Sequence, residues 1–357
     1  MVARRGSGIR GPVSIGGQFT VLLAVLSSGC SEEENPFEYT TLARVESHQE
    51  GRLCEGDRRK IDERIEFVAE TLGTNPPDAV QIALFPSAPV PGCNSPFGCY
   101  SRGVARATSQ SLDHEIVHAV AAPLGETRKL WGEGLAEALS GRFLRRTWDA
   151  ETTVVTEWGE TTSAELDYTL AGHFAKWIIE TRGVEAYLRL YAGEDVESVL
   201  GLSLDDVGAE YISDAPWGYS SDACLEPAAA VVLEEHTEDF EIDCDVDGMR
   251  HLVGGYPDSV ALSKNLQVEG PGTYAVTLSR GWGFRVLRCL SEVVREEEPP
   301  TEGGGIFHDA DVLPPIPVLL GNDENLLELQ AGIHRFTVFG TAGLEREQVA
   351  LTLRRVD

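Results

Sequence analysis

The sequence predicts an α+β domain followed by an all-β sandwich domain. A chain of 357 residues is longer than one hydrophobic core usually serves, which favours two domains. Apolar residues recur at helical spacing through most of 111–213, whereas short runs of β-branched and aromatic residues, separated by turn residues, follow residue 216. We therefore expect the α+β domain at 51–215 and the β-sandwich domain at 216–357.

An export signal is expected at residues 1–30. Basic residues precede an apolar stretch, Phe19–Leu26, that is far shorter than the roughly 20 residues needed to cross a bilayer. The small residues that follow end at Cys30 and resemble a bacterial lipobox, in which the cysteine is lipidated and becomes the mature N-terminus. The alternative is an ordinary signal peptide cut near the same place. Either signal takes the protein to the bacterial cell envelope, and the lipobox would anchor it to the outer membrane.

The chain is strongly acidic, with 58 Asp and Glu residues against 29 Lys and Arg residues and a formal net charge of −29. Binding to nucleic acid depends on clustered Lys and Arg, so this balance argues against a nucleic-acid partner. Residues 31–50 are acidic and only weakly patterned. We expect them to form a flexible tether between the export signal and the first domain.

Besides Cys30, the chain contains six cysteines, and an even number in an exported protein favours disulfides. They are Cys54, Cys93, Cys99, Cys224, Cys244 and Cys289. The short loop between Cys93 and Cys99 makes these two the easiest pair. Because three cysteines fall in each half of the chain, that pairing predicts at least one bridge between the halves.

The α+β domain is predicted to begin with one helix and two strands. Apolar spacing predicts a helix at Asp57–Leu72, which Gly73 ends. Val80–Phe85 and Gly103–Thr108 are the two expected strands. The second of these would either offer a free edge to an extended peptide or be an ordinary edge strand.

Helices are expected to dominate the rest of this domain. Ser111 is expected to cap a helix that Pro123 ends. Further helices are predicted at Trp131–Ser140, Leu166–Thr181, Ala186–Tyr191 and Leu204–Ile212. In the second domain, strands are predicted at Thr273–Leu278, Phe284–Leu290, Leu326–Gln330, Arg335–Gly340 and Val349–Arg354.

The residues His114-Glu115-Ile116-Val117-His118 fit the H-E-x-x-H pattern on one of these predicted helices. Residues four apart lie one turn above each other on a helix, so His114 and His118 can hold one zinc ion. Glu115 would stand beside the metal, where it can take a proton from the attacking water. A catalytic zinc usually has a third protein ligand, and Glu133 and Glu137 follow on the next predicted helix.

Together with the nearby Glu133-Gly134-Leu135-Ala136, the H-E-I-V-H sequence resembles the gluzincin zinc metallopeptidases, particularly the peptidase MA-like group. The likeness extends over about 57–213 and implies a zincin-like catalytic domain that hydrolyses peptide bonds with Zn²⁺. It implies that Glu133 is the third zinc ligand and that Glu137 bonds to a histidine ligand. The two glutamates could exchange these roles, because Glu137 stands at the spacing of the aminopeptidase group. The β-rich remainder loosely resembles a pre-peptidase C-terminal type of accessory domain.

Peptide hydrolysis also needs a donor for the oxyanion, and Tyr168 and His173 are the candidates, with Tyr168 preferred. Pocket residues are expected in loops such as Thr147–Ser163. Three alternatives remain. They are a solvated helix with coincidental histidines, a zinc hydrolase that does not cut peptides, and an inactive lipoprotein of this fold that acts as a binding or adhesion module.

Overall fold

A computed structural model of the chain describes most of the residues between 37 and 356. The described residues are 37–48, 53–125, 127–142, 144–145, 166–224, 228–231, 235–242, 244, 250–251, 259–278, 282–289, 319–320, 324–341 and 347–356. The expected signal peptide, its lipidation site Cys30 and the loop Thr147–Ser163 lie outside these ranges. Within them, no helix has both the length and the apolar character that a membrane span requires.

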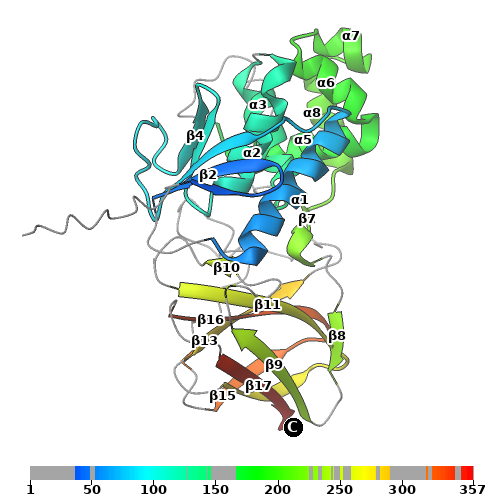
Figure 1. The fold of residues 1–357 in the computed structure, drawn as a ribbon. Coiled ribbons are helices and arrows are strands. Elements are labelled where there is room, and N and C mark those ends of the chain that lie inside the picture. Colours follow the sequence, from blue (N-terminus) through cyan, green and yellow to red (C-terminus); the bar gives the residue numbers. More distant parts are fainter. Residues whose placement is uncertain are drawn as a thin grey trace, which may run out of the picture. The chain divides into compact units, whose positions relative to one another are not determined.

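Five strands form a mixed sheet near the start of the described chain (Figure 1). They are β1 (Phe37–Tyr39), β2 (Ala43–Ser47), β3 (Val80–Leu84), β4 (Gly98–Ser101) and β5 (Val104–Ala107). The strand order is β1-β2-β3-β5-β4, in which β2, β3 and β5 are parallel and each edge strand is antiparallel to its neighbour. Strands β3 and β5 confirm the two strands predicted in this region.

The first two strands lie where the sequence led us to expect a flexible tether, so that expectation for 31–50 is wrong over 37–47. The physical reason is that buried apolar residues alternate with charged residues in this acidic segment, which is the pattern of a strand with one buried face. Ala43 and Val45 are 2% and 0% exposed, and the charged residues beside them face the other side of the sheet. Pairing of β2 with β3 then orders the segment.

The helices lie close to the predicted positions. They are α1 (Glu55–Leu72), α2 (Leu112–Ala121), α3 (Lys129–Leu139), α5 (Tyr168–Arg182), α6 (Val184–Tyr191), α7 (Val196–Leu200) and α8 (Leu204–Asp214). A short 3₁₀ helix, η1 (Ala122–Leu124), contains Pro123 and ends α2, as predicted. The sequence did not predict α7, which is short and has no buried residue.

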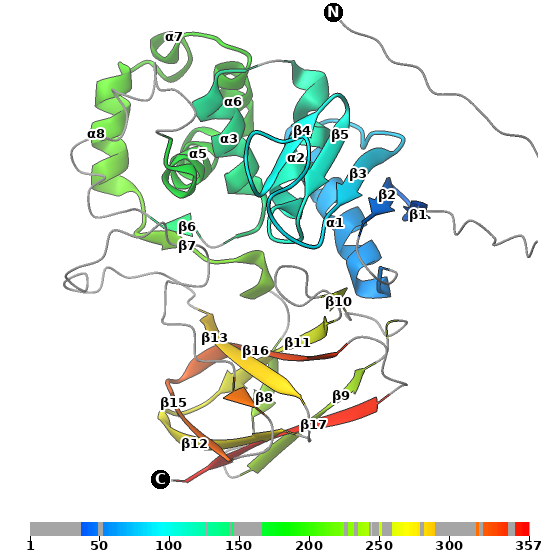
Figure 2. The same ribbon diagram turned by 90° about the vertical axis from the view of Figure 1, so that its left-hand side faces the viewer.

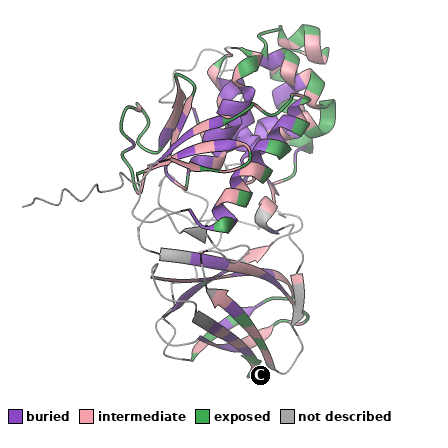
Figure 3. Cartoon of the chain, viewed as in Figure 1, coloured by how far each residue is buried: buried purple, intermediate pink, exposed green. Residues whose placement is uncertain are grey.

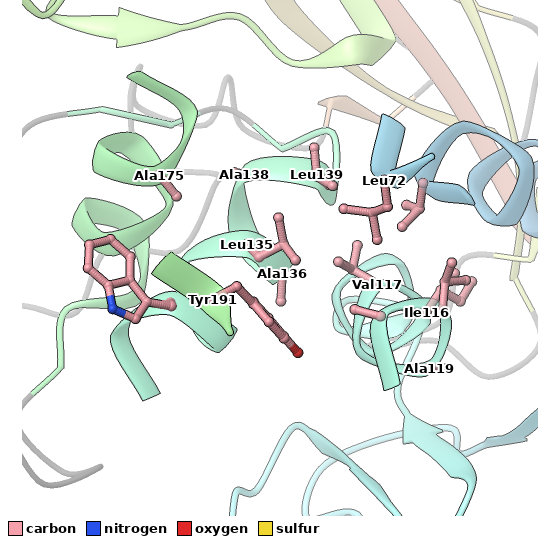
Figure 4. Close-up of a cluster of buried hydrophobic side chains, with 14 of the residues drawn as sticks. Leu72, Ile116, Val117, Ala119, Leu135, Ala136, Ala138, Leu139, Ala175 and Tyr191 are labelled. Carbon is pink, nitrogen blue, oxygen red and sulfur yellow. The ribbon is translucent and has the colours of Figure 1, made fainter. Parts of the chain in front are cut away.

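Helices α1, α2, α3 and α5 contribute to one hydrophobic core. In Figure 4, Leu72 of α1, Val117 of α2 and Leu139 of α3 lie together. Helices α2 and α3 are coloured mostly as buried in Figure 3, whereas α7 is exposed or intermediate along its length. Because α2 and α3 bury most of their surface, any charged side chain on their inner faces needs a partner there.

The chain after residue 228 forms two sheets (Figure 2). Their strands are β8 (Ala228–Val231), β9 (Glu235–Ile242), β10 (Arg250–His251), β11 (Ser259–Val268), β12 (Gly272–Leu278), β13 (Gly283–Cys289), β14 (Leu319–Leu320), β15 (Asn325–Leu329), β16 (Gly332–Thr341) and β17 (Glu347–Arg355). One sheet has the order β10-β11-β16-β13-β14 with β8 beside β11, and the other has the order β15-β12-β17-β9. All five strands predicted here are confirmed.

Both sheets contribute side chains to a second hydrophobic core. Phe240 of β9 and Val276 of β12 come from one sheet, and Phe284 of β13 and Phe336 of β16 come from the other. All four side chains are fully buried. Burial of this apolar surface therefore holds the two sheets face to face.

The helical part of the chain extends further than the predicted boundary at residue 215. Strand β7 (Gly218–Tyr219) pairs with β6 (Leu144–Arg145), and Tyr219 packs against the first core. The following 3₁₀ helix, η2 (Asp222–Cys224), is also tied to this part, because Asp222 pairs with the buried Arg64 of α1. Backbone pairing between distant segments carries no local sequence signal. The sequence therefore placed the end of the first domain too early, at residue 215.

Three disulfides connect the six cysteines of the described chain. Cys93 pairs with Cys99, as predicted from the short loop between them. Cys54 at the start of α1 pairs with Cys244, which confirms that one bridge joins the two halves of the chain. Cys224 pairs with Cys289 at the end of β13.

Candidate metal centre

Helices α2 and α3 bring two imidazoles and one carboxylate together. His114 and His118 lie one turn apart on α2, and Glu133 lies on α3. Nε2 of His114 and Nε2 of His118 are 3.1 Å apart, and Oε2 of Glu133 is 3.1 Å from each of them. Within the described chain, this is the one group of His, Cys, Asp or Glu side chains with ligand atoms placed to share a metal ion.

The triangle of ligand atoms fits a tetrahedral zinc ion. Zinc binds imidazole nitrogen and carboxylate oxygen at about 2.0–2.2 Å, which puts neighbouring ligand atoms of a tetrahedron about 3.3–3.5 Å apart. The observed separations of 3.1 Å are close to that value. The oxygen of Glu133 can only accept hydrogen bonds, and a neutral imidazole keeps a lone pair on one nitrogen. Three such atoms facing one point suit a cation, and the fourth tetrahedral position is left for water.

Glu137 lies behind this triangle and faces the other nitrogen of a histidine ligand. Its Oε1 is 2.8 Å from Nδ1 of His114, and both side chains are 8% exposed. Nη1 of Arg142, which follows α3, is 3.7 Å from the same carboxylate oxygen. This contact fixes the ring so that Nε2 points at the metal position, the arrangement that carboxylates commonly impose on zinc-bound histidines. Of the two glutamates, Glu133 thus faces both Nε2 atoms, whereas Glu137 faces Nδ1 of His114.

Electrostatics in the metal-free cluster favour a positive charge at its centre. Burial works against a charged ring at His114, but the Glu137 carboxylate and the contact with Glu133 raise the pKa of His114 to about 10. Burial likewise disfavours a charged Glu133, yet the hydrogen bonds to both histidines hold the pKa of this carboxyl below its ordinary value. The two carboxylates thus favour a positive charge at His114, as they would favour a metal cation beside it.

Glu115 is buried beside the metal ligands and is not one of them. Its side chain is 5% exposed, and burial raises the pKa of its carboxyl, although the nearby His114 and His118 oppose the shift. Its Oε2 has no hydrogen-bond partner in the described chain. Burial of a carboxylate oxygen without a hydrogen-bond partner costs free energy. Such an atom is typical of a group that binds a ligand or a water.

Tyr168 stands at the start of α5, on the side of the metal ligands. Its ring centroid is 6.2 Å from that of His114, and the Nζ of Lys129 lies 5.3 Å from the Tyr168 ring centroid. Partial burial and the charge of Glu133 raise the pKa of the Tyr168 hydroxyl. Tyr168 therefore keeps its proton and lies near the candidate ligands.

His173, the other oxyanion candidate, belongs to the core and not to the metal centre. It is fully buried, and its Nδ1 is 2.8 Å from the hydroxyl of Tyr211 on α8. On α5 it lies five residues after Tyr168, and five residues turn a helix far enough to place the two side chains on different sides. Trp131 is also a packing residue, since its ring contacts Phe174 and it is 5% exposed.

The strand expected to offer a free edge is not an edge. The segment Gly103–Thr108 contains β5, which is hydrogen-bonded to β3 on one side and to β4 on the other. Strand β4 is the edge instead. It was missed because its four residues, Gly98–Ser101, begin within the short disulfide loop and contain no run of β-branched residues.

Helix α3 approaches α5 closely because glycines stand at the crossing. A Cβ on Gly134 would lie 3.0 Å from the backbone oxygen of Ala171, and a Cβ on Gly172 would overlap the Cβ of Glu137. Bulkier residues would force the two helices apart and shift the carboxylates that α3 carries. The glycine in the Glu133-Gly134 pair thus serves helix packing beside the ligand.

Sequence reasoning did not identify three further side chains around the centre. Arg142 contacts Glu137, Lys129 lies near Tyr168, and Tyr191 of α6 is close enough to Glu133 that this charge helps to raise the pKa of its hydroxyl. These residues come from helix ends or from a later helix. No spacing in the sequence links them to the H-E-x-x-H pattern, so only the fold reveals them.

No protein-family model and no curated protein matches this chain. Among solved structures, the chain is similar to a periplasmic inhibitor of g-type lysozyme from Aeromonas hydrophila. The two are 12% identical over 36% of this chain and 94% of the inhibitor, with a TM-score of 0.20. A TM-score this low supports no conclusion about a shared fold or function.

Proposed function

We propose that this chain is an exported zinc-dependent peptidase of the gluzincin type, with a zincin-like catalytic domain. The observation that carries the proposal is the triangle of ligand atoms from His114, His118 and Glu133, with separations of 3.1 Å. Glu115, which follows the first ligand, supplies a buried carboxylate with one oxygen that has no partner in the described residues. Ligands, base and a vacant coordination position are the parts that metal-assisted hydrolysis requires.

In the proposed reaction, His114, His118 and Glu133 hold Zn²⁺. When bound, zinc supplies a Lewis acid that polarises the scissile carbonyl and lowers the pKa of the attacking water to about 7. Glu115 takes the proton of that water and passes it to the leaving amine. Tyr168 donates a hydrogen bond to the oxygen that gains charge in the transition state.

The substrate in this proposal is a peptide or protein. Strand β4 is the edge of the sheet, and its first residue lies next to the carboxylate of Glu115. An extended peptide that pairs with β4 would bring its backbone close to the proposed base. In this proposal, β4 pairs with the peptide, whereas the sequence suggested Gly103–Thr108 for that role.

Export and membrane attachment belong to the same proposal. Three disulfides in one chain are typical of proteins that fold outside the cytoplasm. We infer that residues 1–30 direct export and that lipidation of Cys30 anchors the mature protein to the outer membrane. Labelling of the expressed protein with radioactive palmitate tests the anchor, because Cys30→Ser should abolish the label.

The activity is tested with purified mature protein, by metal analysis and by cleavage of casein or a peptide library. We expect about one zinc per chain, cleavage that stops on chelation and returns with zinc, and a Glu115→Gln variant that keeps the zinc but loses cleavage. The exposed Glu194→Gln is a matched control and should cleave like the wild type. Bound zinc without cleavage of any peptide would favour a binding or adhesion module, or a zinc hydrolase with another substrate.

A further inference from the structure

Gly98, the first residue of β4, lies against the proposed base. A Cβ built on Gly98 would be 2.8 Å from Oε1 of Glu115, 2.8 Å from Oγ of Ser111 and 2.7 Å from the backbone oxygen of Arg106. Real Cβ atoms essentially never come within 3.0 Å of another heavy atom in this way. The carboxylate of Glu115 thus occupies the space that a side chain of residue 98 would need.

The glycine at this position is explained by space and not by backbone conformation. Several glycines of the chain have positive φ angles, but Gly98 is not among them. Any residue could therefore adopt its backbone conformation. Glycine inside a strand weakens the strand and often marks the close approach of another group. Here three groups approach, namely the backbone oxygen of Arg106, Oγ of Ser111 and the carboxylate of Glu115, and the last is the one with proposed chemistry.

Strand β4 is fixed on both sides of this contact. Before Gly98, the backbone oxygen of Phe97 accepts a 2.6 Å hydrogen bond from Oγ of Ser111 and a 3.2 Å hydrogen bond from the backbone of Thr108. After Gly98, Cys99 forms the disulfide with Cys93. Ser111 directly precedes α2, the helix that carries Glu115. Strand β4 and the carboxylate of Glu115 are therefore both connected to the N-terminal end of α2.

We propose that Gly98 is a positioning residue for Glu115: its missing side chain lets the carboxylate lie between β4 and the metal ligands, where β4 limits its rotation. The inference rests on the proposed function, because it assigns a role in that reaction. A methyl group at residue 98 would collide with the carboxylate of Glu115, whereas neither His114 nor His118 is among the nearest neighbours of that methyl.

The first test compares Gly98→Ala with wild type for zinc affinity, kcat and KM. We expect unchanged zinc affinity, little change in KM and a kcat about 100-fold lower, which is the loss that a displacement of about 1 Å causes in a catalytic group. Gly270→Ala is the matched control, since its added methyl meets only the end of the Arg355 side chain at 3.3 Å, and it should keep the wild-type kcat. A Gly98→Ala variant with wild-type kcat overturns the inference.

The second test does not depend on catalysis. Gly98→Ala is introduced into wild type and into Glu115→Ala, and the urea midpoint of each protein is measured. If the methyl collides with the carboxylate, the fall in midpoint is smaller in the Glu115→Ala background. Equal falls, or failure of Gly98→Ala to fold in both backgrounds, overturn the inference. A wild type that binds no zinc and cleaves nothing refutes the proposed function instead, and the midpoints still report on the contact.

Discussion

Oε1 of Glu137 lies 2.8 Å from Nδ1 of His114, while Nε2 of the same ring faces the oxygen of Glu133. One imidazole therefore has a carboxylate at each nitrogen, one on either side of the ring. An imidazole that donates from Nδ1–H to a carboxylate becomes a better metal ligand at Nε2, and the direction of its lone pair is fixed. The different positions of the two carboxylates lead to different predictions for their replacement.

Glu137→Gln should weaken zinc binding without removing it. The amide keeps the shape of the side chain but loses the charge that faces His114, and partners of this kind change metal affinity by about 10–100-fold. Competition with a chromophoric chelator measures the affinity. Glu180→Gln is the control, because Glu180 is a surface residue paired with Lys176, and its affinity should equal that of wild type. Loss of zinc in Glu137→Ala together with its retention in Glu133→Ala would show that the two glutamates have exchanged roles.

Zinc affinity should rise with pH. In the metal-free protein, the neighbouring carboxylates outweigh burial and raise the pKa of His114 to about 10, so this ring is protonated at neutral pH. Zinc needs the lone pair on Nε2 and must displace that proton. Below the raised pKa, the apparent affinity should therefore increase about tenfold per pH unit, with about one proton released per zinc. Calorimetry in buffers of different ionisation enthalpy measures the release, and an affinity that is constant between about pH 7 and 9 would contradict this prediction.

Tyr168→Phe should lower kcat about 100-fold and leave zinc affinity unchanged, the pattern expected when one donor to an oxyanion is lost. The Tyr168 ring lies 6.2 Å from that of His114, near the ligands, but Tyr168 is not one of them. Tyr274→Phe provides the same chemical change in the second core, where the hydroxyl donates to the oxygen of Gly270. This control should lose some stability and keep its kcat. A Tyr168→Phe variant as active as wild type would remove Tyr168 from the mechanism.

A disulfide that closes a longer loop should contribute more to the free energy of unfolding than one that closes a shorter loop. The bridges Cys54–Cys244, Cys224–Cys289 and Cys93–Cys99 span 190, 65 and 6 residues. If each acts by restricting the unfolded chain, their loss costs about 5, 4 and 2 kcal/mol. Urea unfolding of the three Cys→Ser pair variants measures these values. A larger loss from the shortest loop than from the longest would show that native contacts dominate.

The sequence correctly predicted that His114 and His118 lie together, because helical periodicity is a local property. His114 and His118 are four residues apart, so the helix alone brings them together. The ligand role of Glu133 is different, because it depends on the way α3 packs against α2 and came from a family resemblance. Gly134 and Gly172 allow α3 to pack closely against α5, which helps to place α3, and no local pattern encodes these contacts between helices.

The remaining errors concern strand pairing. Strands β1 and β2 were missed because their charged residues hide the alternation of Ala43 and Val45, and the edge was assigned to β5 because β4 is short. Strand order is decided by contacts between distant segments, which local propensity does not contain. For the same reason, Gly98 could not be linked to Glu115 from the sequence.

Anomalous scattering at the zinc edge, from crystals of the wild-type protein grown with equimolar zinc, tests the central claim most directly. We expect one strong peak, at about 2.0–2.2 Å from Nε2 of His114, Nε2 of His118 and Oε2 of Glu133, with a water at the fourth position. A peak bound by other side chains, or none at this triangle when the protein contains zinc in solution, would contradict the proposed metal centre and the hydrolysis that depends on it.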